Sequence, residues 1–444
     1  MMRGLSLLVL LCGFATTVHA ATKSIDKPNI IFILADDYGI GEVGAYGGDA
    51  YKTPHIDALA KSGIRFSHAY TVPLCGPSRA QILSGRYPFR TGATNQDATG
   101  VIPMPDREIF MPRILKSAGY VSTMIGKWGQ LPLRASDYGF DDSLQFKGSG
   151  IYWNTQAKGR TYEVNDKTVV LRDKEYMPDV MHNHLINFLE QNRNKPFYAY
   201  YSLSAVHNEI LPTPDSVPGS KTLYADNVHY MDKLVGKLMQ ELERLHLREN
   251  TLIVFFGDNG TAAAQARMAT IGGRQIHGSK GTMLEGGSRV PLIVNWKGVT
   301  PVGVVADNPI DSSDFLPTFA EITGTALPAH TIIDGRSFAP QLRGQPGQKR
   351  DWIFTQLARK WQVQEAGFKL NQSGELFNMA DNPFGETLVD KDSKEPAAVA
   401  ARARLQRALE SLNPAGGFLD QGDGTGRHAV KDKDKKLANK EKED

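Results

Sequence analysis

Cysteine is nearly absent from this sequence, which has two cysteines, Cys12 and Cys75, among 444 residues. Cys12 lies in an N-terminal segment that we expect to be removed, so the mature chain keeps one cysteine and forms no internal disulfide. This excludes a small disulfide-stabilised scaffold, and no Cys/His cluster favours a zinc site. With 41% hydrophobic residues, the chain can bury a large core, and one large domain plus a small one is expected.

An excess of charge of one sign is also lacking. The 51 lysines and arginines nearly balance the 48 aspartates and glutamates, for a formal net charge of +3. We therefore expect neither a nucleic-acid partner nor a polybasic membrane contact. The apolar run at residues 5–14 is too short to span a membrane.

That apolar run instead predicts export. Arg3 precedes it, and the small residues that end in Ala20 follow it, which is the pattern of a secretory signal peptide over residues 1–20. An exported chain whose mature form has no disulfide is expected in the periplasm or outside a bacterial cell. We expect no membrane span.

Two apolar segments, residues 28–34 and 251–256, predict buried strands of a parallel sheet. Each segment is followed directly by side chains that carry oxygen atoms: Asp36, Asp37, Asp258 and Asn259. Open α/β sheets place their sites at this carboxyl edge of the strands. Adjacent acids in a loop are most often only solvated, so the two acids of the first pair do not by themselves establish a metal site.

The most informative segment surrounds the remaining cysteine. Cys75-Gly76-Pro77-Ser78-Arg79 predicts a tight turn that enters a helix, because Pro77 suits a first helical turn and Gly85 ends the helix. A side chain at a helix start lies at the positive end of the helix dipole, where anions bind. An isolated cysteine in such a place is usually just a buried thiol. A cysteine that begins the combination C-x-P-x-R is much less common than an isolated cysteine.

This segment resembles the signature of type I sulfatases, in the alkaline phosphatase superfamily. The resemblance continues through Ser84-Gly85-Arg86-Tyr87-Pro88 and residues 90–92. In that family a maturation enzyme oxidises the cysteine to formylglycine, and the hydrated aldehyde is the nucleophile. The resemblance implies that Cys75 is the modified nucleophile and that Arg79 holds the hydrate and offsets its charge.

Further blocks resemble the family in the same order between residues 27 and 388. They are the acid pair at 36–37, Gly126-Lys127-Trp128, Ala205-Val206-His207, Gly257-Asp258-Asn259-Gly260 and residues 277–291. The resemblance implies that a divalent cation is held by Asp36, Asp37, Asp258, Asn259 and the modified Cys75. Hard cations prefer such oxygen ligands, and we expect Ca²⁺, with Mg²⁺ as the alternative.

The family's roles carry over to the remaining polar residues of these blocks. Lys127, Lys280 and His207 would contact the sulfate, and His207 or Lys280 would protonate the leaving oxygen. Asp258 would accept the proton during attack.

One block departs from the family pattern. Most relatives read G-K-W-H-L, whereas this chain reads Gly126-Lys127-Trp128-Gly129-Gln130-Leu131. Either Gly129 replaces the histidine, or Gln130 occupies its place next to the substrate. Glutamine can orient a hydroxyl but cannot serve as a base, so we expect turnover to be affected more than binding.

The implied fold is α/β, with a large, mixed, mostly parallel sheet between helices and a smaller antiparallel C-terminal subdomain. We expect a signal peptide over 1–20, a catalytic domain over 27–333, a subdomain over 334–418 and a disordered, charged tail over 419–444. Residues 143–174 are expected to be insertions that border the pocket. His182 and His184, on a helix that contains Met181, are expected at the surface.

The function expected from these features is removal of sulfate from a sulfated carbohydrate or an aryl sulfate. Two alternatives remain open on sequence alone. One is a phosphonate or phosphodiester hydrolase of the same superfamily, and the other is a low-activity protein that binds sulfated glycans. The expected partners are the sulfated substrate and the formylglycine-generating enzyme.

Overall fold

The structure is a computed structural model, which describes residues 27–96, 107–129, 131–148, 150–155 and 161–427. The predicted signal peptide and Gln130 lie outside the described residues. Within these ranges, none of the helices has the length and apolar character needed to cross a membrane.

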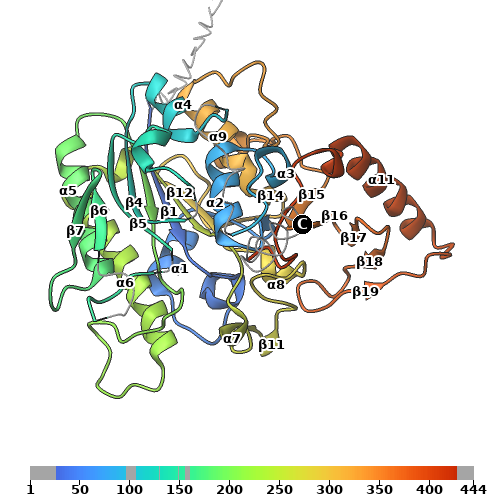
Figure 1. The fold of residues 1–444 in the computed structure, drawn as a ribbon, viewed down its shortest axis with the longest axis horizontal. Coiled ribbons are helices and arrows are strands. Elements are labelled where there is room, and N and C mark those ends of the chain that lie inside the picture. Colours follow the sequence, from blue (N-terminus) through green and yellow to red (C-terminus); the bar gives the residue numbers. More distant parts are fainter. Residues whose placement is uncertain (1–26, 97–106, 130, 149, 156–160, 428–444) are drawn as a thin grey trace, which may run out of the picture.

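A sheet of ten strands forms the centre of the large domain (Figure 1), in the order β13-β2-β12-β9-β1-β8-β4-β5-β6-β7. The strands are β1 (Asn29–Ala35), β2 (Ile64–Phe66), β4 (Val121–Gly129), β5 (Asp142–Lys147), β6 (Thr161–Val164), β7 (Lys167–Val170), β8 (Phe197–Ser202), β9 (Thr251–Gly257), β12 (Leu292–Trp296) and β13 (Val304–Ala306). The inner strands β9, β1, β8, β4 and β5 are mutually parallel, whereas β12 is antiparallel to β9. Their carboxyl ends therefore meet at one edge.

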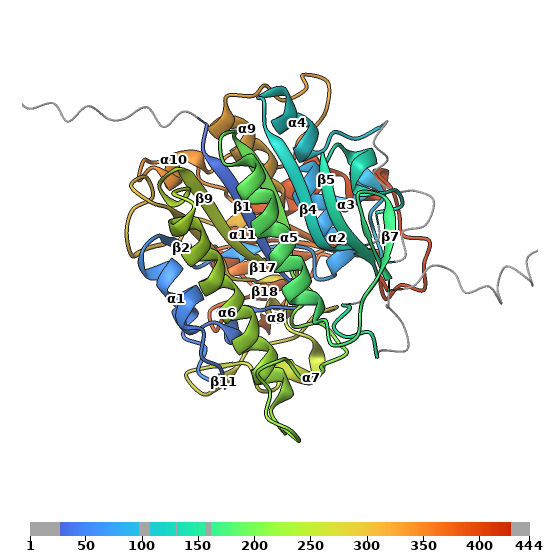
Figure 2. The ribbon, with the colours of Figure 1, turned by 90° about the vertical axis from the view of Figure 1, so that its left-hand side faces the viewer.

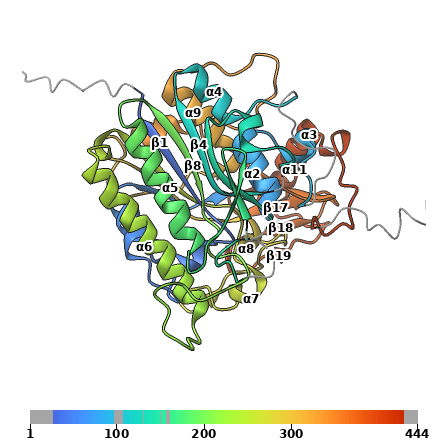
Figure 3. The ribbon, with the colours of Figure 1, turned by 60° about the vertical axis from the view of Figure 1, so that its left-hand side comes forward.

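Helices cover both faces of this sheet, as the views in Figures 2 and 3 show. One face carries α1 (Pro54–Lys61), α5 (Met177–Asn192) and α6 (Leu223–Arg244), and the other carries α2 (Cys75–Ser84), α4 (Met111–Ser117) and α9 (Phe315–Thr323). Strand β1 contributes to both cores, because successive side chains of a strand point to opposite faces. Ile30, Phe32 and Leu34 pack with α2, α4 and α9. Ile31 and Ile33 pack with α1, α5 and α6.

A second sheet of five antiparallel strands forms the smaller unit, with α11 (Pro396–Leu412) packed on it (Figure 1). Its strands are β15 (Ile353–Leu357), β16 (Lys360–Glu365), β17 (Phe368–Asn371), β18 (Leu376–Asn378) and β19 (Thr387–Leu388). A large mostly parallel sheet between helices, followed by a small antiparallel sheet with a helix, confirms the predicted fold class.

The two sheets are joined through a shared buried cluster. Tyr87, from the large domain, packs on Phe354 of β15 with ring centroids 4.7 Å apart. Arg350 forms a short ion pair with Asp314, and its Nη1 donates to the hydroxyl of Tyr87 at 3.2 Å. Because both charged partners of this pair are only 3% exposed, removing either one would leave the other buried and uncompensated.

Residues 143–174 were expected to be insertions that border the pocket. This is wrong for residues 143–147, 161–164 and 167–170, which form strands of the large sheet. Most of strand β5 lies in this segment, and β6 and β7 pair as an antiparallel hairpin that extends the large sheet. The hairpin turns at Asn165 and Asp166, whose φ angles of 47° and 66° are both positive. Two-residue turns of this kind favour Asn and Asp, and their right-handed twist matches that of paired strands.

The predicted disordered tail is also wrong at its start. Residues 419–427, which we call the C-terminal strap, belong to the described structure. The carboxylate of Asp420 is 1% exposed and accepts a hydrogen bond from Asn95 Nδ2 at 2.5 Å. Composition alone did not indicate this anchor, because the buried contact depends on one aspartate in a segment rich in charged residues and glycine.

The predicted surface position of His182 is wrong as well. This side chain is 5% exposed on α5, and its Nδ1 has no hydrogen-bond partner in the described structure. Burial lowers the pKa of His182 to about 4. His184, by contrast, is partly exposed and lies 2.8 Å from the carboxylate of Asp142. The spacing of Met181, Leu185, Phe188 and Leu189 identifies the apolar face of α5, but not the exact edge of that face.

The buried ring of His182 predicts a pH dependence of stability. Between the ordinary pKa of 6.5 and the folded value of about 4, the unfolded chain binds a proton that the folded chain does not, so stability falls as pH falls. The variant His182→Leu should therefore gain about 3 kcal/mol in free energy of unfolding, relative to wild type, between pH 7 and pH 4. Urea unfolding at both pH values measures this difference, and His229→Leu, at an exposed site on α6, is the control. A difference that is the same at both pH values would contradict the assignment.

Candidate active site

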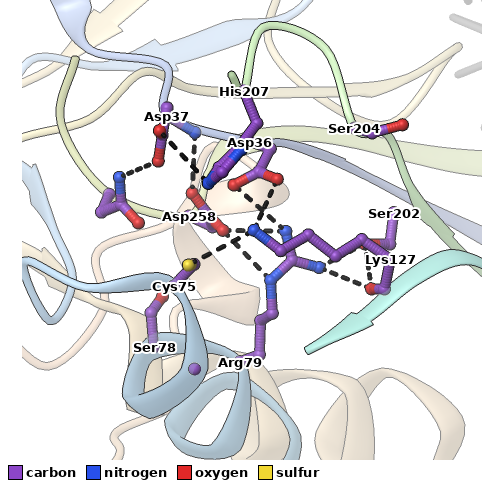
Figure 4. Close-up of polar contacts among 12 residues, drawn as sticks. Asp36, Asp37, Cys75, Ser78, Arg79, Lys127, Ser202, Ser204, His207 and Asp258 are labelled. Carbon is purple, nitrogen blue, oxygen red and sulfur yellow. Dashed lines mark hydrogen bonds and ion pairs between the residues drawn. The ribbon is translucent and has the colours of Figure 1, made fainter. Parts of the chain in front are cut away.

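The candidate site lies where the carboxyl ends of four neighbouring strands meet, and Figure 4 shows its side chains. Asp36 and Asp37 follow β1, and Asp258 follows β9. Lys127 lies in β4, and Ser202 ends β8. Since these strands are adjacent and parallel, the sequence-distant side chains come together without long connecting loops.

Cys75 approaches this strand edge from the first residue of α2. Its side chain is 1% exposed, and α2 ends at Gly85, whose φ of 67° is the left-handed conformation that glycine adopts readily. Three donors reach the Cys75 sulfur: Gln96 Nε2 at 3.0 Å, Lys127 Nζ at 3.3 Å and Lys280 Nζ at 3.8 Å. Two ammonium groups and an amide around one atom favour an electron-rich or anionic group there.

Arg79 lies one turn after Cys75 on the same helix and is also 1% exposed. Its Nε and Nη2 donate to Asp258 Oδ2 at 3.1 and 2.8 Å. Its Nη1 donates to the carbonyl oxygen of Lys127 at 2.8 Å and to the hydroxyl of Ser202. Burial opposes the charge of Arg79, but the surrounding negative groups, first Asp258 and then Asp36, together outweigh it and raise the pKa of the guanidinium. The guanidinium of Arg79 therefore holds the carboxylate of Asp258 and the carboxyl ends of β4 and β8 together.

The carboxylates of the site are held by the lysines. Lys127 Nζ lies 2.7 Å from Asp36 Oδ2, and Lys280 Nζ lies 2.5 Å from Asp37 Oδ1. Burial would raise the pKa of Asp36, but the charge of Lys127, with those of His207, Arg79 and Lys280, holds it well below its usual range.

Asp258 titrates differently from Asp36. Burial, followed by the negative charge of Asp36, raises the pKa of Asp258 to about 7. Its Oδ1 accepts the backbone N–H of Asp37 at 3.0 Å, and Asp37 has a φ of 60°. A non-glycine residue in this left-handed conformation is uncommon. It occurs here where the loop after β1 turns toward the end of β9.

The site has the chemistry of a cation site. Ligand atoms of Asp36, Cys75 and Asp258 lie within 4.8 Å of one another, and so do those of Asp36, Asp37 and His207. Asp36 Oδ1 and Asn259 Oδ1 are buried without a hydrogen-bond partner in the described structure. Buried polar atoms normally have a partner, and a hard cation would supply one. The residues present therefore fit a divalent cation with oxygen ligands.

His207 borders the same group of side chains. Its Nε2 lies 3.8 Å from Asp37 Oδ2, and its Nδ1 donates to the carbonyl oxygen of Asn208 at 2.6 Å. That carbonyl requires the proton to be on Nδ1, so Nε2 carries the lone pair when the ring is neutral. Burial lowers the pKa of His207.

The structure thus brings together every predicted site residue that it describes. These are Asp36, Asp37, Cys75, Arg79, Lys127, His207, Asp258, Asn259 and Lys280. Gln130 lies outside the described residues. Gly129 has a φ of 89°, and a Cβ built on it would lie 3.0 Å from Arg79 Cδ. Histidine at position 129 would therefore strain the backbone and press on Arg79.

Sequence reasoning missed two residues that contact the site. Gln96 holds Cys75 from both sides, because its Oε1 accepts the backbone N–H of Gly76 at 3.0 Å and its Nε2 donates to the sulfur. Ser202 links Arg79 to the carbonyl of Lys127, to which it donates at 2.7 Å. Ser202 ends a buried strand beside the acids, which was a usable signal, whereas Gln96 lies in no helix or strand and gave none.

A cavity of about 280 Å³ opens onto this group of residues. It is lined by Asp37, His207, Asn208, residues 262–265, Lys280 and Arg427. It therefore connects the carboxylates and cations of the site with solvent.

Comparison with known proteins identifies relatives of the whole arrangement. The family model described as Sulfatase matches residues 28–325. N-acetylgalactosamine-6-sulfatase of Canis lupus familiaris is 32% identical over 356 residues, which cover 73% of this chain and 67% of that protein. Arylsulfatase D of Homo sapiens is 29% identical over 461 residues, covering 82% of this chain and 77% of that protein.

Solved structures agree. The crystal structure of Ps i-CgsB matches with a TM-score of 0.76 and 27% identity, over 90% of this chain and 97% of that chain. The same protein is also known in complex with k-i-k-neocarrahexaose. The family match spans more than half of the chain and includes the buried site just described, so this chain belongs to the sulfatase family, in the alkaline phosphatase superfamily, and is a hydrolase of sulfate esters.

Proposed function

We propose that this enzyme removes sulfate from a sulfated carbohydrate, with an aryl sulfate as a simpler substrate, at the site around Cys75. One observation carries this proposal: two lysine ammonium groups and the amide of Gln96 lie within 3.8 Å of the Cys75 sulfur. Relatives named for N-acetylgalactosamine or solved with neocarrahexaose support a sugar.

Cys75 is the proposed nucleophile after conversion to formylglycine by a maturation enzyme. One hydroxyl of the hydrated aldehyde would attack the sulfur atom of the sulfate ester. The second hydroxyl would then lose its proton, which re-forms the aldehyde and expels the sulfate. The helix start at Cys75 and the ammonium groups of Lys127 and Lys280 favour negative charge on the attacking hydroxyl oxygen. Gln96 would orient it, because its amide bonds both to the sulfur position and to the next backbone N–H.

A divalent cation, Ca²⁺ or alternatively Mg²⁺, is the proposed cofactor. Its ligands would be oxygens of Asp36, Asp37, Asp258 and Asn259 and of the modified Cys75. When bound it would lower the pKa of the nucleophile and polarise the sulfate. Lys127 and Lys280 would then contact sulfate oxygens rather than balance the carboxylates alone.

Two proton transfers are assigned to residues, one from the attacking hydroxyl and one to the leaving oxygen. Asp258 would accept the proton of the attacking hydroxyl, because its ligand oxygen lies within 4.8 Å of the Cys75 sulfur. We assign protonation of the leaving oxygen to His207 rather than Lys280. The ammonium of Lys280 is held by the carboxylate of Asp37 at 2.5 Å, and this ion pair makes it a poor proton donor. Arg79 would act by positioning Asp258 and the hydrate.

The N-terminal sequence completes the proposal. A signal peptide over residues 1–20 would direct the enzyme to the periplasm or outside the cell. We also propose a catalytic domain over 27–333 and a C-terminal subdomain over 334–418, with the strands of the two sheets lying within residues 29–306 and 353–388.

The substrate class is tested by comparing kcat/KM values for 4-nitrophenyl sulfate, bis(4-nitrophenyl) phosphate and sulfated galactose. We expect the sulfate esters to be hydrolysed at least about tenfold faster than the diester, since the buried lysines suit a tetrahedral group with several free oxygens. The matched control is Cys75→Ala, which should lose about 10³-fold or more. A dominant phosphodiesterase activity would overturn the choice of substrate.

The modification is tested by mass spectrometry of the peptide that contains Cys75. Conversion of the thiol to an aldehyde lowers its mass by about 18 Da. We expect this shift in protein made together with a formylglycine-generating enzyme, and not in protein made without it. An unshifted peptide in an active preparation would show that the unmodified side chain performs the reaction.

The metal site is tested by calorimetry and thermal unfolding after treatment with chelator. Ca²⁺ at a hundred times its dissociation constant should stabilise the protein by about 2.7 kcal/mol. Asp37→Asn should weaken binding at least about tenfold, because it removes one ligand charge. Asp215→Asn, at an exposed acid paired with Lys233, should bind as wild type does. Equal binding by both variants would place the cation elsewhere, and the same titration with Mg²⁺ decides between the two ions.

A further inference from the structure

The C-terminal strap, residues 419–427, crosses from the small subdomain to the catalytic site. At its start, the carbonyl oxygen of Asp420 accepts a hydrogen bond from Arg359 Nε at 2.8 Å, while its buried carboxylate accepts one from Asn95. Near its end, the carbonyl oxygen of Gly426 accepts the backbone N–H of Gln96 at 2.6 Å. The strap is therefore attached to residues of both domains.

Gly426 lets the strap lie close to Leu74 and Leu357. It is buried with a φ of 74°, and a Cβ on it would lie 2.8 Å from Leu357 and 2.9 Å from Leu74. Leu74 directly precedes Cys75. A larger residue could not take this position without moving the strap away from the start of α2.

The last described turn fixes the backbone of Arg427. Asp423 Oδ1 accepts hydrogen bonds from the backbone N–H and the hydroxyl of Thr425, at 3.0 and 2.6 Å. The same hydroxyl oxygen accepts the backbone N–H of Arg427 at 3.1 Å. These side-chain to backbone bonds hold the turn in one conformation.

Arg427 lines the active-site cavity together with residues assigned to the chemistry. The cavity wall also contains Asp37, His207 and Lys280. A Cβ built on Gly281, whose φ is 80°, would lie 2.9 Å from Arg427 Nη2, so the guanidinium lies against the backbone of the residue after Lys280. Glycine at position 281 leaves the space that this guanidinium occupies.

The charge of Arg427 has no carboxylate partner among the described residues. Asp37, the acid among the residues that line the cavity, is already paired with Lys280 at 2.5 Å. The larger cavity of about 600 Å³ at the junction with α11 provides the contrast. Its arginines, Arg86 and Arg90, each pair with a carboxylate at 2.7 Å.

We propose that Arg427 forms a subsite for a second anionic group of the substrate. This inference rests on the proposed function and narrows it: the preferred substrate is a sulfated sugar that carries another sulfate, or a carboxylate, near the ester that is cleaved. A guanidinium offers a planar pair of donors that matches either oxyanion. The strap fixes the backbone of Arg427 before the substrate arrives, so little backbone freedom is lost on binding.

The test measures binding to the Cys75→Ala protein with Ca²⁺ present, so that no turnover occurs. The probes are a galactose monosulfate, a galactose disulfate and a disaccharide of the monosulfate with glucuronic acid. We expect one or both of the doubly charged probes to bind about tenfold tighter than the monosulfate. Which of the two gains affinity distinguishes a sulfate subsite from a carboxylate subsite. Equal affinity for all three probes would overturn the subsite.

Variants then assign that preference to Arg427. Arg427→Ala should reduce the preference for the second charge to less than about twofold, and Asp420→Ala should do the same by releasing the strap. Arg407→Ala, at an exposed arginine of α11 that lines neither cavity, is the matched control and should keep the full preference. A preference that survives in Arg427→Ala would overturn the assignment.

Failure of the proposed function has a separate signature. Protein that carries formylglycine but hydrolyses no sulfate ester would contradict that function, whatever the binding data show. Protein that hydrolyses the monosulfate and the disulfate with the same kcat/KM, and loses nothing in Arg427→Ala, would leave the function intact and remove the subsite.

Discussion

The site depends on the balance of buried charge at one edge of the sheet. Asp36, Asp258 and Lys127 are all almost completely buried, and an isolated charge in such a place would neutralise or destabilise the fold. Each charged group is therefore tied to one of opposite sign, with Arg79 joined to Asp258 and Lys127 joined to Asp36. The rest of the domain supplies the adjacent parallel strands that bring these pairs within reach.

Much of this arrangement follows from local sequence patterns. Continuous apolar residues predicted a strand at residues 28–34, and the strand forms at residues 29–35. The acids after it fall at the carboxyl edge because the strand is parallel to both neighbours. The start of α2 at Cys75 and its end before Gly85 follow from Pro77 and from the glycine. The convergence of these segments on one site came from resemblance to a family, since periodicity alone does not order strands in a sheet.

The parts that the sequence did not predict depend on contacts between distant segments. His182 differs from an exposed helical histidine only in what α5 packs against. The β6–β7 hairpin has a turn signal at Asn165 and Asp166, but its strands are too short to give a clear alternating pattern. Asp420 is buried because Asn95 and Arg359 surround it, and neither partner can be inferred from a charged, glycine-containing tail.

Gln96 joins these observations. Its side chain bonds to the Cys75 sulfur and to the backbone of Gly76, and its own backbone N–H bonds to Gly426 of the strap. The last described part of the chain is thus two hydrogen bonds away from the nucleophile position. The proposed recognition by Arg427 and the proposed orientation of Cys75 by Gln96 therefore share one support, and the strap is the segment through which the small subdomain would reach the nucleophile position.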